Sequence, residues 1–365
     1  MRLTLAAALA LALCLCGGPA PAGGVPPHGG RTGSVDLLVS PMAVTATEDR
    51  RTVGVNLGAL FALRAWRTLH RPTPADGPDA VQSATVYWPV DEGQVIDTPE
   101  AAASQGASLV LWGAARHYGD GYLVDPYLSL TAWAGTASQA GVWTVALPRG
   151  QVSLGLPRRI FALGTALLPD ELVERYSTPG ALRVCAQKVQ ACDGPQVGEG
   201  MTARIQEPGW SQVITNDHVT GWIYLPGLTG GAADIGAFPG AVVAYYRGEF
   251  AYAARLFDGV ARDEAEPDQL RSDARALAIA ARSRTDPASA APDAARLTEA
   301  PGSAYDVQVA VMNRLTEAGR SDRAVRAAAM AAAAAYVRRW SKLFEVDDPW
   351  LGQVERVLGV GASKS

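Results

Sequence analysis

Two apolar stretches joined by a glycine-containing turn most strongly constrain what this chain can fold into. Residues 108–112 have the sequence SLVLW, which is typical of a buried strand, and we extend that strand to residue 118. The next residues, 119–121, are Gly-Asp-Gly, and glycine tolerates the positive φ that a tight hairpin turn requires. Residues 122–131 predict the return strand. An antiparallel strand pair is therefore expected over residues 108–131.

Further strands and helices surround this hairpin. Thr98 followed by Pro99 indicates a helix N-cap with proline at the first helical position. The order of elements is β-α-β-α-β-β-β, which favours a mixed sheet with helices packed on it, spanning residues 34–150. The predicted elements are strands at 34–42, 84–88 and 141–147, a long helix at 52–70 and a short helix at 99–105.

This first region resembles the amino-terminal domain of TolB-like and related bacterial envelope proteins. The resemblance rests on the strand at 35–41 followed by a long helix, on the run GASLVLWGA at 106–114, and on YGDGYLV at 118–124. It covers about a third of the chain. It implies an accessory or assembly domain of the cell envelope, with no catalytic residues to carry over.

Residues 160–176 predict a helix inside a linking segment at 151–178, and from residue 179 the pattern changes to short alternating strands. Strands at 210–214 and 221–224 flank a polar turn at 215–218. Their aromatic residues are expected on the faces of a small barrel.

Residues 179–228 resemble a bacterial SH3 domain. The most specific part of the resemblance is a pair of Gly-Trp strands, GWSQV at 209–213 and TGWIY at 220–224. LRV at 182–184, VGEG at 197–200 and TARI at 202–205 match the opening of such a domain. The chain departs from the family at Cys185 and Cys192, since bacterial SH3 domains usually carry a polar strand without cysteines at this place.

Cysteine use predicts one disulfide. Cys14 and Cys16 lie in a leader segment that is expected to be removed, so the mature chain keeps Cys185 and Cys192. In an oxidising compartment two cysteines this close in sequence most simply pair with each other. Their spacing is not that of a zinc ribbon or a redox CxxC motif, so no metal site is predicted.

The last third of the chain is predicted to be helical, over residues 236–345, with a tail at 346–365. It resembles degenerate tetratricopeptide repeats, in which a glycine makes the tight turn between two helices and alanines let the helices approach. Two copies of the pattern lie 71 residues apart, close to two 34-residue periods. They comprise Gly248, Phe250, Ala253 and Phe257 in the first copy, and Gly319, Ser321, Ala324 and Ala328 in the second.

The middle of this helical region is less regular. Pro287, Pro292 and Pro301 are expected to break the helices there, because proline lacks the backbone N–H group. A plain helical bundle is the alternative to degenerate repeats. The fold class is thus multidomain α+β, with a mixed α/β sheet domain, a small SH3-like β-barrel and a C-terminal helical region.

The first 22 residues have the features of a secretory signal peptide. Arg2 precedes an apolar run at 3–16, which is too short for a membrane span, and Ala-Pro-Ala at 20–22 is a cleavage pattern. Residues 23–33 form a Gly/Pro-rich lead-in. A second interpretation is a lipoprotein acylated at Cys14 or Cys16, although leucine precedes each cysteine where a small residue is usual. The mature chain is predicted to be periplasmic or extracellular, without a transmembrane span.

Charge and motifs exclude several functional classes. The formal net charge of −4 does not fit a polybasic nucleic-acid binder, so no nucleic-acid partner is expected. The sequence has no G-x-S-x-G, HExxH, Walker or GxGxxG motif, and its four histidines lie on different predicted elements. We therefore predict a protein that is not an enzyme and has no cofactor.

Three aromatic residues of the barrel, Trp210, Trp222 and Tyr224, are the candidate ligand-binding residues. They are expected to form a shallow groove for an extended peptide or a glycan strand. The alternative is that one tryptophan is core and the other packs between domains. The predicted function is an exported envelope scaffold or adaptor that binds protein partners, and cell-wall peptide or glycan, through the barrel and the helical repeats. A ligand sensor that regulates an envelope enzyme is the alternative, and an enzyme of unknown reaction ranks third.

Overall fold

The structure is a computed structural model. The expected signal peptide (1–22), its lipidation cysteines, the lead-in (23–33) and the short helix at 99–105 lie outside the described residues. The described residues are 36–45, 50–71, 81–82, 85–87, 109–130, 141–157, 160–177, 183–189, 192–195, 202–207, 209–215, 217–224, 236–345 and 347–359.

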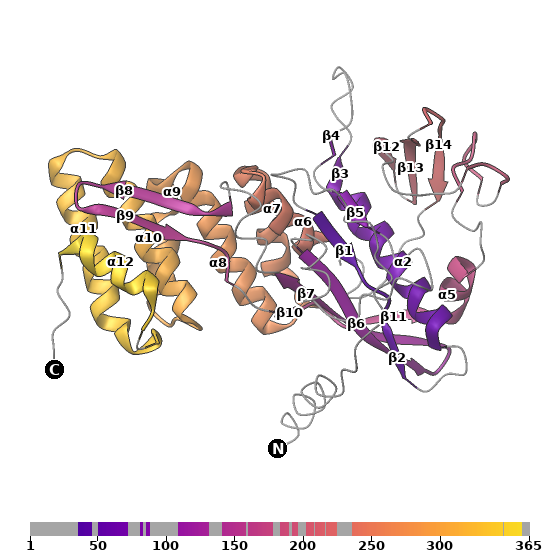
Figure 1. The fold of residues 1–365 in the computed structure, drawn as a ribbon, viewed down its shortest axis with the longest axis horizontal. Helices are drawn as coiled ribbons and strands as arrows, with labels where there is room; N and C mark the ends of the chain where they lie inside the picture. Colours follow the sequence, from indigo (N-terminus) through magenta and orange to yellow (C-terminus); the bar gives the residue numbers. More distant parts are fainter. Residues whose placement is uncertain are drawn as a thin grey trace, which may run out of the picture.

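The first part of the chain forms the predicted mixed sheet (Figure 1). Its main strand order is β10-β7-β6-β1-β5, with β2 also paired to β6 and β11 to β7. The strand β1 runs parallel to β5 and β6, and β2 runs parallel to β6, whereas β7 pairs antiparallel with β6, β10 and β11. The bounds are β1 (Asp36–Val39), β2 (Ala43–Thr45), β5 (Thr85–Tyr87), β6 (Leu109–Tyr118), β7 (Gly121–Leu130), β10 (Ile160–Ala162) and β11 (Ala166–Pro169), with β3 (His70–Arg71) and β4 (Val81–Gln82) as a separate short pair.

The hairpin expected at 108–131 is confirmed. The strands β6 and β7 pair along their full lengths, from Leu109 opposite Leu130 to Tyr118 opposite Gly121. Gly119 has a φ of 64°, the left-handed conformation that a residue with a Cβ rarely adopts. Local turn chemistry therefore sets the register of the two longest strands.

One long helix covers one face of this sheet (Figure 1). It is α2 (Arg50–Leu69), close to the helix predicted at 52–70. Its buried side chains belong to the same hydrophobic core as alternate residues of β1, β6 and β7, which follow the period of two in strands. The apolar residues of this shared core include Leu57, Leu60, Phe61 and Trp66 from the helix and Leu37, Leu109, Leu111, Val124 and Leu128 from the strands.

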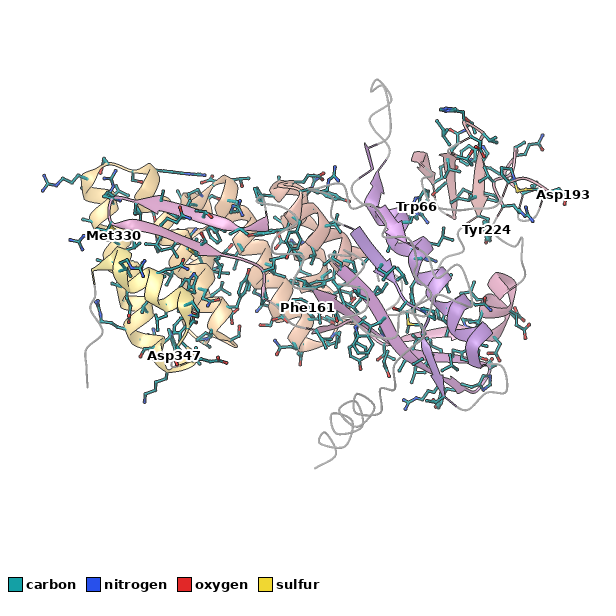
Figure 2. All side chains as sticks on the ribbon, in the orientation of Figure 1. Trp66, Phe161, Asp193, Tyr224, Met330 and Asp347 are labelled. Atoms are coloured by element: carbon teal, nitrogen blue, oxygen red, sulfur yellow. A yellow bond between two sulfur atoms is a disulfide. The ribbon has the colours of Figure 1, made fainter. Side chains whose placement is uncertain are left out.

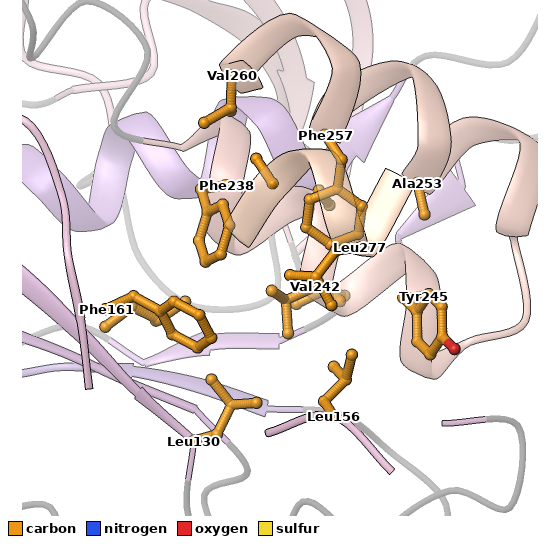
Figure 3. Close-up of a cluster of buried hydrophobic side chains, with 14 of the residues drawn as sticks. Leu130, Leu156, Phe161, Phe238, Val242, Tyr245, Ala253, Phe257, Val260 and Leu277 are labelled. Atoms are coloured by element: carbon orange, nitrogen blue, oxygen red, sulfur yellow. The ribbon is translucent and has the colours of Figure 1, made fainter. Parts of the chain in front are cut away.

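A helix without charged residues joins the sheet to the helical region. It is α6 (Ala237–Tyr246), and all ten of its residues are buried. A helix that is apolar on every side must be surrounded by protein. Figure 3 shows Phe238 of α6 between Phe161 of β10 and Phe257 of α7, with ring centroids 4.9 and 5.6 Å apart. The sheet and the helices therefore share one hydrophobic core.

The helix predicted at 160–176 is wrong over its first ten residues. These residues form β10 and β11, which pair with β7, and only α5 (Asp170–Ser177) is helical. Burial alternates along the two strands, with Phe161, Ala166 and Leu168 buried and Ile160 and Leu167 exposed. This period of two is the signature of a strand that has one face on the core.

The strand predicted at 141–147 exists, but it does not close the mixed sheet. It is β8 (Trp143–Leu147), and it pairs only with β9 (Gly150–Leu154) in a two-stranded ribbon. Trp143, Val145, Val152 and Leu154 are buried on one face of this ribbon. That face packs against helices near the C-terminus, far from the sheet (Figure 1).

Residues 236–345 form three antiparallel helix pairs. This confirms that the region is helical. The tight turn predicted after the first helix is present, with Gly248 at a φ of 81°. The second helices of the pairs begin at residues 250, 287 and 323, close to the spacing of a 34-residue repeat. The pairs are α6 with α7 (Phe250–Arg262), α8 (Asp268–Thr285) with α9 (Pro287–Leu297), and α10 (Ala304–Arg320) with α11 (Arg323–Trp340), followed by the short η2 (Ser341–Leu343).

Buried and partly exposed polar contacts hold the middle pair in place. Asn313 of α10 is fully buried, and its amide donates to the hydroxyl of Ser283 on α8 and to the carbonyl of Pro287 on α9. Arg282 of α8 forms ion pairs with Asp258 of α7 and Asp293 of α9. Side chains from neighbouring pairs thus fix the register of the array.

Two expectations about the helical region are wrong. The prolines do not break the middle pair, because Pro287 occupies the first helical position, where no backbone N–H bond is needed, and Pro292 removes one bond inside α9. Pro301 falls in the connection before α10. The segment expected as a tail contains α12 (Pro349–Leu358), which packs on β9.

The ribbon contact is specific. Trp143 of β8 is buried, and its Nε1 donates to the hydroxyl of Thr316 on α10 over 3.0 Å. The backbone N–H of Ser153 on β9 donates to Oε1 of Gln353 on α12, which occupies one edge of the ribbon. The ribbon therefore connects α10 to α12.

We expect Trp143→Ala to lower the free energy of local opening of α10 and α12 by about 3–5 kcal/mol, because it removes a buried aromatic side chain. Amide hydrogen exchange of the two helices measures this change. Thr144→Ala, on the exposed face of the same strand, is the matched control and should change it by less than about 0.5 kcal/mol. Equal effects of the two substitutions would contradict the assigned ribbon contact.

Candidate functional site

The candidate residues lie on a small antiparallel sheet with the order β12-β13-β14. Its strands are β12 (Thr202–Glu207), β13 (Trp210–Ile214) and β14 (Thr220–Tyr224). Side chains alternate between its two faces. Ser211, Val213 and Ile223 are buried on one face, which faces the core together with Val184.

The other face carries all three predicted aromatic residues, and we call it the aromatic face: Trp210, Gln212, Trp222 and Tyr224. The register places Trp210 opposite Tyr224 and Gln212 opposite Trp222. All four are half-buried, and the rings of Trp210 and Tyr224 lie 5.0 Å apart. Neither tryptophan is a fully buried core residue. The stick view in Figure 2 places Tyr224 on this small sheet, at the far end of the molecule from Met330.

The predicted disulfide between Cys185 and Cys192 is present. Cys185 also pairs with β14, because its N–H donates to the carbonyl of Trp222 and its carbonyl accepts from the N–H of Trp222. The cysteine loop therefore begins as a bridge at the free edge of β14. Among the described residues, the pairing of the small sheet extends no further than this bridge, so closure into a barrel stays a prediction.

Two further residues of this face were not predicted as site residues. Lys188, in the cysteine loop, places its ammonium 4.2 Å from the ring centroid of Trp222. The same ammonium forms an ion pair with the carboxylate of Glu207, at the end of β12. A signal was available in the sequence, because only three of the 32 basic residues of the chain are lysines.

The small sheet also contacts the mixed-sheet domain. The guanidinium of Arg67 on α2 donates to the backbone carbonyl of Glu207 over 2.9 Å. Burial lowers the pKa of Arg67 from its ordinary value. One end of the aromatic face is thereby fixed to the long helix that covers the mixed sheet.

Other polar groups do not assemble into a reactive centre in the part of the chain that the structure describes. His117 pairs with Asp170 at the surface of the mixed sheet, and its ring contacts Tyr122 edge-on. No three His, Cys, Asp or Glu residues of the described ranges lie close enough to hold a metal ion. None of the described helices is both long and apolar enough to cross a membrane.

We expect reduction of the Cys185–Cys192 disulfide to destabilise the small sheet by about 2–3 kcal/mol, since the bond closes a short loop. The melting of the small sheet, followed with and without reductant, measures this loss. The Cys185→Ser, Cys192→Ser double variant should melt like the reduced protein and should not respond to reductant. Labelling of both cysteines as free thiols in the native protein would contradict the assignment.

No family model, curated protein or solved structure matches the chain.

Proposed function

We propose that this chain is an exported adaptor of the cell envelope that holds its partner on the aromatic face. The observation that carries the proposal is that Trp210, Trp222 and Tyr224 lie together and half-exposed on one side of the small sheet. Aromatic rings on a rigid sheet offer a large contact area at low entropic cost, which suits an extended peptide or a glycan strand. We further propose that the small sheet belongs to an SH3-like barrel.

The helical region has a different role in this proposal. The ribbon of β8 and β9 already packs against α10 and α12. The surface of these two helices is therefore covered by a segment of the same chain. We therefore assign partner binding to the aromatic face, and we assign to the repeat-like helix pairs the task of holding the ribbon. The sequence analysis assigned partner binding to both the barrel and the helical repeats, and this proposal assigns it to the aromatic face alone.

The proposed location is the periplasm or the cell exterior. A disulfide between Cys185 and Cys192 is compatible with an oxidising compartment. The signal-peptide pattern of residues 1–22 supports the same location.

A sensor that regulates an envelope enzyme is the second candidate. The contact between Arg67 and Glu207 favours it, because this contact joins the aromatic face to α2 and the mixed sheet. In that case, ligand binding should change the activity of a co-purified enzyme. An adaptor would instead bring its partners together without such a change.

We expect the Trp210→Ala, Tyr224→Ala double variant to be retained about tenfold less than the wild type on purified peptidoglycan or by a captured envelope partner, as for the loss of central aromatic contacts. Sedimentation and pull-down with the mature chain measure this. Tyr118→Ala is the matched control, because Tyr118 is an exposed aromatic residue on the mixed sheet. An intact disulfide and an unchanged melt of the small sheet verify folding.

Two outcomes would contradict the adaptor proposal. One is a wild-type chain that is retained by neither material. The other is a double variant that is retained as well as the Tyr118→Ala control.

A further inference from the structure

The ammonium of Lys188 occupies a defined place on the aromatic face. It lies over the ring of Trp222 and beside the carboxylate of Glu207, so one cation has both an aromatic and an anionic partner. A cation over an indole ring is attracted by the negative face of the π-system. The two partners come from β14 and β12, on opposite sides of β13. The ammonium of Lys188 therefore contacts side chains from both outer strands of the small sheet.

Other residues of the aromatic face lie next to Glu207 and Trp222 and together with them form a candidate binding site. The register aligns Glu207, Trp210 and Tyr224 in one row across the three strands. The next row on the same face contains Gln212 and Trp222. A carboxylate, a cation-binding indole, a second aromatic pair and an amide thus lie on one surface. This combination recognises an organic cation that is attached to an extended chain.

The loop that carries Lys188 is short, because the Cys185–Cys192 disulfide closes it. The disulfide closes it three residues before and four residues after Lys188. The side chains of Lys188 and Glu207 are 41% and 42% exposed, so their ion pair is weak and an external cation can compete with it. The loop keeps the ammonium near the site without burying it.

We propose that Trp222 and Glu207 form a recognition site for a primary ammonium group on an extended peptide, and that Lys188 occupies this site in the absence of the ligand. The inference rests on the proposed function, because it names the chemical group that the aromatic face takes. A ligand ammonium displaces Lys188 and makes the same two contacts, while Trp210 and Tyr224 hold the neighbouring part of the peptide.

The test uses the mature chain and two peptides with blocked ends, Gly-Gly-Lys-Gly-Gly and Gly-Gly-Gln-Gly-Gly. Lys188→Met keeps the length of the side chain but removes its charge. It should bind the lysine peptide about three- to tenfold more tightly than the wild type, as the loss of one exposed ion pair and one cation–π competitor implies. Calorimetry and the indole N–H signals in NMR spectra measure binding. The glutamine peptide should bind both proteins equally weakly.

Two further variants make the test specific. Adding Glu207→Gln to Lys188→Met should remove the gain for the lysine peptide, because the anionic partner is lost. Lys342→Met is the matched control, since Lys342 lies on η2 in the helical region, and it should leave binding unchanged. Mass measurement of the intact disulfide and the melt of the small sheet verify that each variant is folded.

The inference is overturned if Lys188→Met does not bind the lysine peptide more tightly, or if it gains equal affinity for both peptides. Equal gains would mean that Lys188 is a steric cover and not a substitute for a ligand cation. These results are separate from the test of the adaptor proposal. Loss of retention in the Trp210→Ala, Tyr224→Ala variant can stand while the peptide test fails, and the adaptor proposal alone then survives.

Discussion

The burial of α6 is the constraint on which the rest of the structure depends. This helix has no charged residue, and it can be stable only where protein surrounds it on every side. The mixed sheet supplies one side through Phe161, and α7 supplies another through Phe257. A continuous row of aromatic rings therefore crosses from strand to helix to helix. The sheet domain and the helix pairs cannot be treated as independent modules on a flexible linker, because neither could separate without exposing α6.

Local patterns predicted much of the fold. The β6–β7 hairpin, α2 and the turn at Gly248 were found because each depends on residues that are close in sequence. Partner choice was harder, since it depends on distant residues. The apolar run at 141–147 identified a strand, but nothing in it distinguishes pairing with the mixed sheet from pairing with β9. The sequence of residues 160–169 does not distinguish a helix from a strand, because short apolar runs fit both periods. Only the alternating burial of these residues against β7 decides for a strand.

In the candidate site too, local patterns were predicted from the sequence and contacts between distant residues were not. Trp210, Trp222 and Tyr224 were predicted together because a strand places every second residue on one face, and the register across β13 and β14 puts them side by side. Lys188 and Glu207 were missed. Lys188 reaches the face from a loop whose path is set by a disulfide and a backbone bridge, and such a path leaves no periodic pattern in the sequence. The scarcity of lysine was the only local indication.

The position of the ribbon has a consequence for how the chain reaches its native state. Trp143 finds its hydrogen-bond partner 173 residues later, and Ser153 finds its partner 200 residues later. Contacts of such long sequence separation form slowly, because a large loop must close before they contribute. During synthesis the apolar face of β8 and β9 is therefore made long before α10 and α12 exist to cover it. An exposed strand pair of this kind is prone to pair with other chains. The risk of aggregation therefore falls once α12 has been made and covers β9.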